Sequence, residues 1–169
     1  MRNLKMKHLP MRCLTAFAGL FALTIGGMIY VLYRSHSLLV FHIAGKLGLS
    51  AWIDHIRNSA PILELPEWVI YSLPGGLWAA AYILMIEAVA QPWPPRKRML
   101  WASSIPLCGI ASELLQGIGC LPGIFDPIDA LFYAIPLGFY ICLMNTFKTP
   151  QCGVSTYPQN INNKNEHYE

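Results

Sequence analysis

Residues 13–33 read CLTAFAGLFALTIGGMIYVLY, twenty-one consecutive positions without a charged side chain. A helix that crosses the hydrocarbon core of a bilayer needs roughly 20 apolar residues. Arg2, Lys5, Lys7 and Arg12 precede this run. A cleaved signal peptide begins in the same way, but its apolar core has only about 7–15 residues and is followed by a small-residue cleavage site. No such site follows here, so we interpret the segment as a retained membrane anchor.

The composition of the whole chain agrees with this interpretation. Of the 169 residues, 54% are hydrophobic and 12% are charged, whereas soluble domains carry about 25% charged residues. Further apolar runs cover residues 68–91, 99–116 and 127–147. The connection PWPPRKR at 92–98 ends the first of these runs, because proline cannot continue a helix. We therefore predict an all-α fold, a polytopic membrane helical bundle with four spans.

The basic residues indicate how the spans are oriented. With the N-terminus inside, nine lysines and arginines fall in inner segments and three in outer segments. The inner set is Arg2, Lys5, Lys7, Arg12, Arg96, Lys97, Arg98, Lys148 and Lys164, and the outer set is Arg34, Lys46 and Arg57. Cytoplasmic loops carry the excess of basic residues in membrane proteins, so we predict a multi-pass protein with both termini cytoplasmic.

This topology divides the chain into three parts. Residues 1–12 form a basic cytoplasmic N-terminus, and residues 13–147 form a single transmembrane helical domain. Residues 148–169 are rich in Asn, Gln and Tyr without an apolar period, and we predict a disordered cytoplasmic tail. Two stripes of small residues predict close helix packing, within the chain or in an oligomer. They are Ala18, Ala22 and Gly26 on the first span and Ser72, Gly76 and Ala80 on the second.

The segment between the first two spans, residues 38–57, has a polar stripe. Its members are spaced by three or four residues: His42, Lys46, Ser50, Asp54 and Arg57. On one helix they share a face, which predicts an amphipathic helix that lies in the outer interface of the membrane. A fifth span is the alternative, but it would place Lys46 near its middle.

Two carboxylates lie inside predicted spans, where ionisable residues cost about 2.5 kcal/mol or more and suggest a site. Glu87 is four residues from the inner end of its span, so we expect it to reach the interface or pair with Arg96 or Arg98. Glu113 is about fourteen residues into the third span and has no basic residue at its level. Its carboxyl is either protonated or faces polar partners, and Gln116 lies on the same helix face.

A Gly/Pro loop then leads to Asp126-Pro127-Ile128-Asp129 at the start of the fourth span. Asp126 is suited to be the N-cap, Pro127 the first helical residue, and Asp129 the acid of a capping box. The alternative is a site, because the hairpin brings Glu113 and Gln116 towards both aspartates. Three converging carboxylates can bind a hard divalent cation or contact a lipid head group or amine. These residues do not point to one particular metal.

Glu113-xx-Gln116, a Gly/Pro loop and Phe125-Asp126-xx-Asp129 at the start of an apolar helix resemble the signature of VanZ-like membrane proteins. The resemblance covers about 35 residues. This chain has Gly123 or a neighbour where that family usually has an arginine. Tyr133 and Pro136 stand in place of an asparagine and a glycine. The resemblance implies a role at the outer face of a bacterial plasma membrane and a link to glycopeptide resistance, with no assigned biochemical activity.

Three hypotheses of function follow. The leading one is a non-enzymatic membrane protein whose outer acidic pocket, formed by Glu113, Gln116, Asp126 and Asp129, binds an envelope lipid, a cation or a glycopeptide. The second is a membrane-embedded enzyme acting on a lipid-linked substrate, with carboxylates as the only catalytic groups. The third is a structural subunit of a membrane complex. No cofactor motif is present, and the basic residues are explained by topology rather than by nucleic-acid binding.

Overall fold

The computed structural model describes residues 2–35, 38–60 and 63–146, which form helices and their connections without a strand. The all-α prediction is therefore confirmed for this part of the chain. The predicted tail at 148–169 lies outside the described residues. The helices are α1 (Arg2–Tyr33), α2 (Leu39–Lys46), α3 (Ser50–Ser59), α4 (Glu67–Tyr71), α5 (Leu73–Val89), α6 (Pro95–Gly117) and α7 (Pro127–Thr146).

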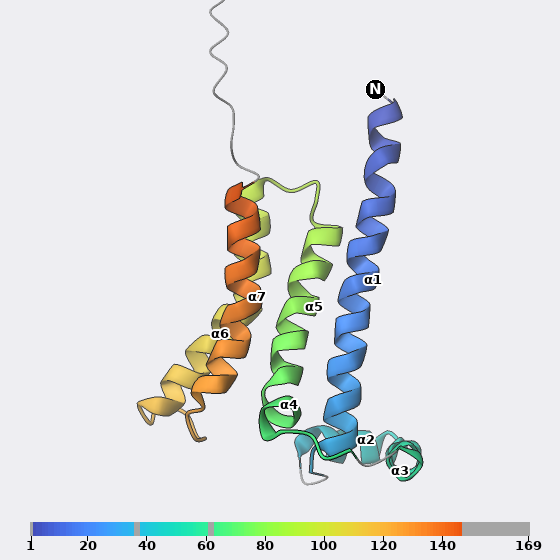
Figure 1. Ribbon diagram of the computed structural model, residues 1–169, viewed down its shortest axis with the longest axis vertical. Helices are drawn as coiled ribbons and strands as arrows, with labels where there is room; N and C mark the ends of the chain where they lie inside the picture. Colours follow the sequence, from blue (N-terminus) through green and yellow to red (C-terminus); the bar gives the residue numbers. More distant parts are fainter. Residues whose placement is uncertain (1, 36–37, 61–62, 147–169) are drawn as a thin grey trace, which may run out of the picture.

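Four long helices, α1, α5, α6 and α7, run alongside one another with alternating direction (Figure 1). We call the upper end of the bundle the end that holds the start of α1, the α5–α6 connection and the end of α7. The lower end holds α2, α3, α4 and the α6–α7 loop. The helix α5 packs against α1 on one side and against α6 and α7 on the other. Apart from Glu87, it is apolar around its whole circumference, as a central or membrane-embedded helix is.

Glycines on α1 allow its close contact with α5. A Cβ atom on Gly19 would lie 3.2 Å from the Ala81 carbonyl oxygen, and one on Gly26 would lie 2.8 Å from Nε1 of Trp78. Both glycines are buried, whereas Ala18 is exposed. Within the chain, the predicted small-residue stripe is therefore confirmed at Gly26, and Gly19 rather than the exposed Ala18 faces α5.

The segment between α1 and α4 differs from the single interfacial helix that the polar stripe predicts. It forms two short helices, because Gly48 has a φ of +73° and ends α2. The Leu49 N–H donates to the Ala44 carbonyl, and the Gly48 N–H donates to that of Gly45, the pattern of a Schellman motif. With 8 and 10 residues, neither helix is long enough to cross a bilayer.

Arg57 also departs from the predicted polar stripe. Its side chain donates hydrogen bonds to the carbonyl oxygens of Val31, at 2.5 Å, and Arg34, at 2.6 Å. These carbonyls are at the end of α1, where intrahelical donors are missing. The guanidinium also lies over the Phe41 ring, 4.8 Å from its centroid. Arg57 therefore fixes α3 to α1, whereas His42, Lys46, Ser50 and Asp54 are exposed.

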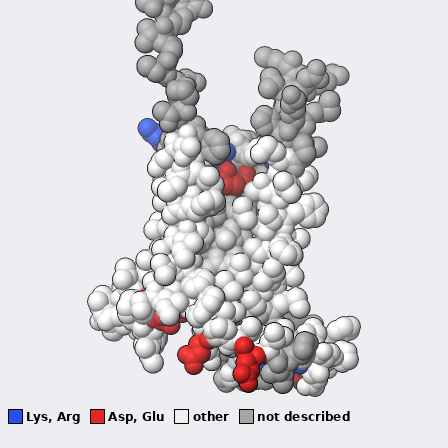
Figure 2. Space-filling model, in the orientation of Figure 1, with Lys and Arg blue, Asp and Glu red and all other residues white. Residues whose placement is uncertain are grey.

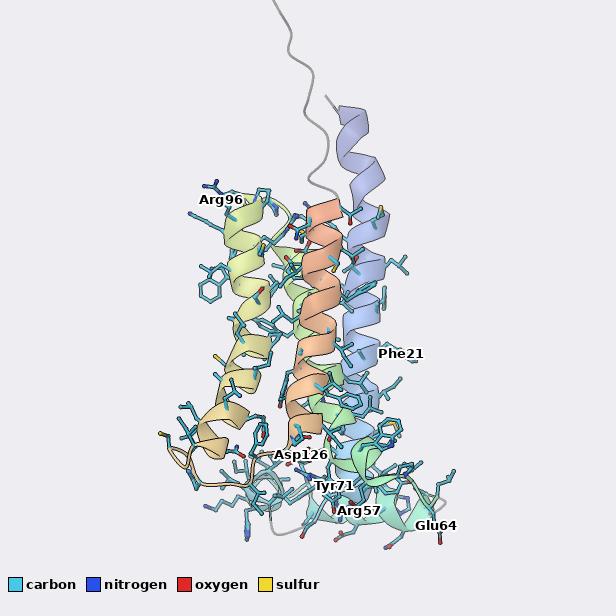
Figure 3. The ribbon with its side chains drawn as sticks, turned by 60° about the vertical axis from the view of Figure 1, so that its left-hand side comes forward. Phe21, Arg57, Glu64, Tyr71, Arg96 and Asp126 are labelled. Carbon is cyan, nitrogen blue, oxygen red and sulfur yellow. The ribbon has the colours of Figure 1, made fainter. Side chains whose placement is uncertain are left out.

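Two helices are long and apolar enough to cross a membrane, Met11–Tyr33 within α1 and Pro127–Thr146, which is α7. The other two long helices do not meet this criterion. The break at Ser72, two residues before Pro74, leaves 17 residues in α5, and α6 has three basic residues in its first turn and contains Glu113. Only 11% of the apolar window of each candidate span is buried, unlike a core helix of a soluble domain. Phe21 of α1, for example, points away from the bundle (Figure 3).

Candidate functional site at the lower end

Glu113 is 8% exposed and lies in the last turns of α6. Its Oε2 atom accepts a hydrogen bond from the backbone N–H of Asp126, at 3.3 Å. That amide belongs to the residue before α7, where the first N–H groups have no helical acceptor. The buried carboxyl group therefore joins the end of α6 to the start of α7.

Asp126 caps α7 as its position predicts. Its Oδ1 atom accepts a hydrogen bond from the Ile128 N–H, at 2.8 Å, and its carbonyl accepts the Ala130 N–H. The second half of the predicted capping box is different, since the acceptor for the Asp126 N–H is Glu113 on another helix. Asp129 therefore does not accept the hydrogen bond from the Asp126 N–H that a capping box predicts for it.

Asp129 has an oxygen atom that the cap does not use. Its Oδ1 is enclosed by protein and makes no hydrogen bond to any part of the chain that the structure describes. Tyr133 is one turn further along α7, on the same face, and both Asp129 and Glu113 act electrostatically on its hydroxyl group. No lysine or arginine among the described residues pairs with either carboxylate.

Tyr133 was not among the predicted site residues. Its ring lies directly over Gly109, where a Cβ atom would be 2.7 Å from the ring carbons, and its hydroxyl lies beside Gly75. These two glycines leave the space in which the ring inserts between α5 and α6. The i, i+4 relation to Asp129 is a signal that the sequence does contain, but the complementary glycines are identifiable only from the packing.

Gln116 contacts the loop rather than the aspartates. Its side chain lies against Gly123, where a Cβ atom would be 2.6 Å from the Gln116 Oε1 atom and where φ is +144°. Within the described ranges, no three Asp, Glu, His or Cys side chains are grouped so that they could hold a metal ion. The predicted convergence of three carboxylates is therefore reduced to Glu113 and Asp129 beside Tyr133, with Asp126 used in the helix cap.

The loop beside these groups exposes large apolar side chains. They are Ile118, Leu121, Ile124 and Phe125, and Ile124 is 92% exposed. Asp126 lies at this end of the bundle, as Figure 3 shows. The site thus combines two carboxylates without a cationic partner in the described residues and an exposed apolar loop.

Glu87 is engaged at the opposite end, as predicted. Its Oε1 atom pairs with Nε of Arg98, at 3.0 Å, and accepts a hydrogen bond from the Tyr140 hydroxyl, at 2.7 Å. These three residues connect α5, α6 and α7. This arrangement connects three helices, whereas Glu113 and Asp129 have no basic partner among the described residues.

Comparisons with models of known protein families, with curated proteins and with solved structures found no match to this chain. The resemblance to VanZ-like proteins therefore stays a prediction that rests on the residues quoted above.

Proposed function

We propose that this chain is a multi-pass protein of a bacterial plasma membrane that binds an amine-bearing envelope lipid at its lower end. In this proposal α1, α4–α5, α6 and α7 cross the bilayer, the upper end faces the cytoplasm and the lower end faces outward. The observation that carries the proposal is the enclosed, unbonded Oδ1 of Asp129, which shares the Tyr133 hydroxyl as a neighbour with the buried Glu113. Buried polar atoms normally have a hydrogen-bond partner, and a lipid ammonium group supplies up to three donors.

The dimensions support four crossings. The combined α4–α5 segment, residues 67–89, and α6 each extend over 23 residues, or roughly 34 Å at 1.5 Å per residue. The hydrocarbon core is about 30 Å thick. A cleaved α1 would uncover the face of α5 that contacts Gly19 and Gly26, so the packing favours a retained anchor.

The charges support the orientation. Arg12, Arg96, Lys97 and Arg98 are at the upper end, and Figure 2 shows most of the visible carboxylates at the lower end, with one further group near the upper end. The excess of basic residues belongs on the cytoplasmic side. The resemblance to VanZ-like proteins points to the same outer-face role.

The topology is tested with Cys120, which is exposed in the lower loop. In a variant that keeps only this cysteine, a membrane-impermeant maleimide is expected to label intact spheroplasts. A cysteine-free background carrying Arg96→Cys is the matched variant and is expected to react only after lysis. Labelling of both before lysis, or of neither, would contradict the proposed orientation.

Lipid binding is tested by the thermal unfolding of the purified protein in detergent with added lipid. Phosphatidylethanolamine, at ten times its Kd, is expected to stabilise the protein by about 1.4 kcal/mol. Phosphatidylcholine, whose quaternary ammonium has no N–H, is expected to give a much smaller effect. Glu113→Gln and Asp129→Asn are expected to lose the difference between the two lipids, because each removes a carboxylate.

Asp126→Asn is the matched control, since asparagine caps a helix as well as aspartate does. It is expected to keep both the stability and the lipid response. Retention of the full response in Glu113→Gln and Asp129→Asn would refute the lipid site and leave the structural-subunit hypothesis in its place.

A further inference from the structure

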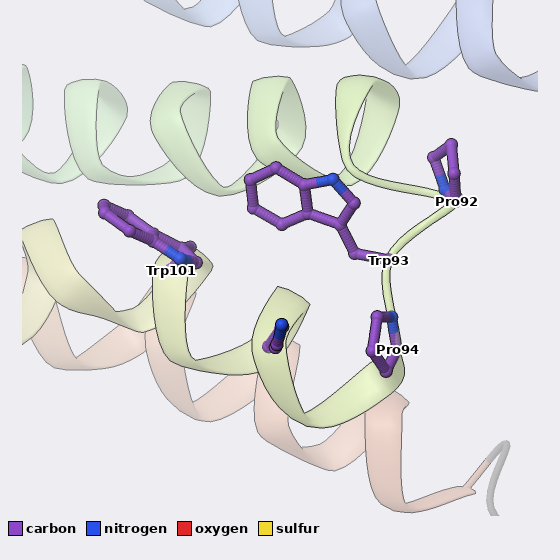
Figure 4. Close-up of a pocket in the computed structure, with 5 residues that line it drawn as sticks. Pro92, Trp93, Pro94 and Trp101 are labelled. Carbon is purple, nitrogen blue, oxygen red and sulfur yellow. The ribbon is translucent and has the colours of Figure 1, made fainter.

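A hollow opens at the upper end, far along the bundle from the acidic groups. It has a volume of about 280 Å³ and is lined by Pro92, Trp93, Pro94, Lys97 and Trp101 (Figure 4). From this hollow we propose a second lipid site, one that binds the phosphate-bearing head group of an anionic phospholipid. The inference rests on the proposed membrane insertion but not on the amine-lipid site at the lower end.

The residues that line the hollow come from the α5–α6 connection and from the start of α6. Pro92 and Pro94 flank Trp93 in the α5–α6 connection, and α6 starts at Pro95. Lys97 and Trp101 are four residues apart on α6 and so lie on the same face, while Trp93 comes from the connection. The hollow is therefore formed by a proline-rich turn and one turn of helix.

The two indoles suit a membrane interface. Trp93 is 45% exposed and Trp101 is 53% exposed. Tryptophan is enriched at the level of the head groups, where its ring contacts the start of the acyl chains and its N–H remains near water. Together with the two prolines, these rings form an apolar wall of the hollow. The apolar part of a lipid can contact such a wall, whereas inorganic phosphate has no apolar part.

Lys97 provides the charge. Glu87 is the one acidic residue at the upper end of the described chain, and it is already held by Arg98 and Tyr140. Arg12 donates to Gln91. Lys97 is exposed and pairs with no carboxylate of the described residues, so its ammonium group is available to a phosphate. A basic group near the membrane surface attracts anionic lipids, and the same hollow is lined by this lysine and by two indole rings.

The test compares Lys97→Gln with Arg96→Gln in the purified full-length protein. Both residues are exposed at the same end and carry the same charge, but Arg96 does not line the hollow. Phosphatidylglycerol added in detergent is expected to raise the unfolding midpoint of the wild type and of Arg96→Gln. At least half of that rise is expected to be lost in Lys97→Gln and restored in Lys97→Arg.

An equal loss in Lys97→Gln and Arg96→Gln would overturn the inference, since it would reveal a general attraction between opposite charges. A full effect of glycerol phosphate alone would also overturn it, because the ligand would then be a free anion. Glu113→Gln is expected to keep the response to phosphatidylglycerol. The failure of the lower site and the failure of this one are therefore distinguishable.

Discussion

Replacing Glu87 by alanine is expected to lower the free energy of unfolding by about 2–3 kcal/mol. The change leaves Arg98 without its ion-pair partner and the Tyr140 hydroxyl without its acceptor. Loss of one partner of a fully buried pair costs about 3–5 kcal/mol. The Glu87 and Arg98 side chains are 21% and 19% exposed, so water reaches the site and the expected cost is below that range.

The measurement is the unfolding of the purified protein in detergent, followed by circular dichroism. Glu64→Ala is the control, because Glu64 is exposed and its loss is expected to change stability by less than about 0.5 kcal/mol. Tyr140→Phe, which removes a hydrogen bond and keeps the ion pair, is expected to cost about 1 kcal/mol. If Glu87→Ala and Glu64→Ala unfold alike, the connection between α5, α6 and α7 contributes nothing to stability.

Replacing Gly76 by alanine is expected to cost about 1–3 kcal/mol, the range for overpacking a close contact. A Cβ atom at this position would lie 2.9 Å from both the carbonyl oxygen and a ring carbon of Phe132. The ring can move, but the carbonyl belongs to the backbone of α7. The two helices must therefore separate, and the α5–α7 contact loosens along its length.

Gly138→Ala on α7 is the matched control, because a Cβ atom there meets nothing within 4 Å. Alanine favours a helix over glycine by roughly 0.5–1 kcal/mol, so this variant is expected to be neutral or more stable. The same detergent unfolding assay measures both variants. Equal stability of Gly76→Ala and Gly138→Ala would show that the helices can separate without loss.

The candidate site was predicted from the sequence in part. Glu113 stands out because an isolated carboxylate in an apolar run is costly, and Asp126 stands out because an Asp-Pro pair at a helix start is a local capping signal. The use of Glu113 as the acceptor for the Asp126 amide was not predictable, since it depends on how closely α6 approaches α7. Tyr133 was missed for the same reason: its position depends on glycines of two other helices.

The sequence by itself determined the features that depend on neighbours along the chain. The apolar runs gave α1 and α7, the prolines at 92–95 ended one helix and started the next, and Asp126 capped α7. Gly48 ended α2 through its positive φ, a local signal that the polar periodicity of 38–57 obscured. Each of these depends on hydrogen bonds or steric limits within a few residues.

Only the tertiary structure decided which helices meet and which side chains share a space. A helix such as α5, whose apolar residues lie on every side, has no preferred face, so its pairing with α1 depends on where glycines permit close contact. The contacts of Arg57 also depend on the tertiary structure. Its side chain was predicted to belong to an exposed polar stripe, but it donates hydrogen bonds to carbonyl oxygens at the end of α1. The physical reason is that unsatisfied backbone groups and packing gaps arise only once the helices lie together.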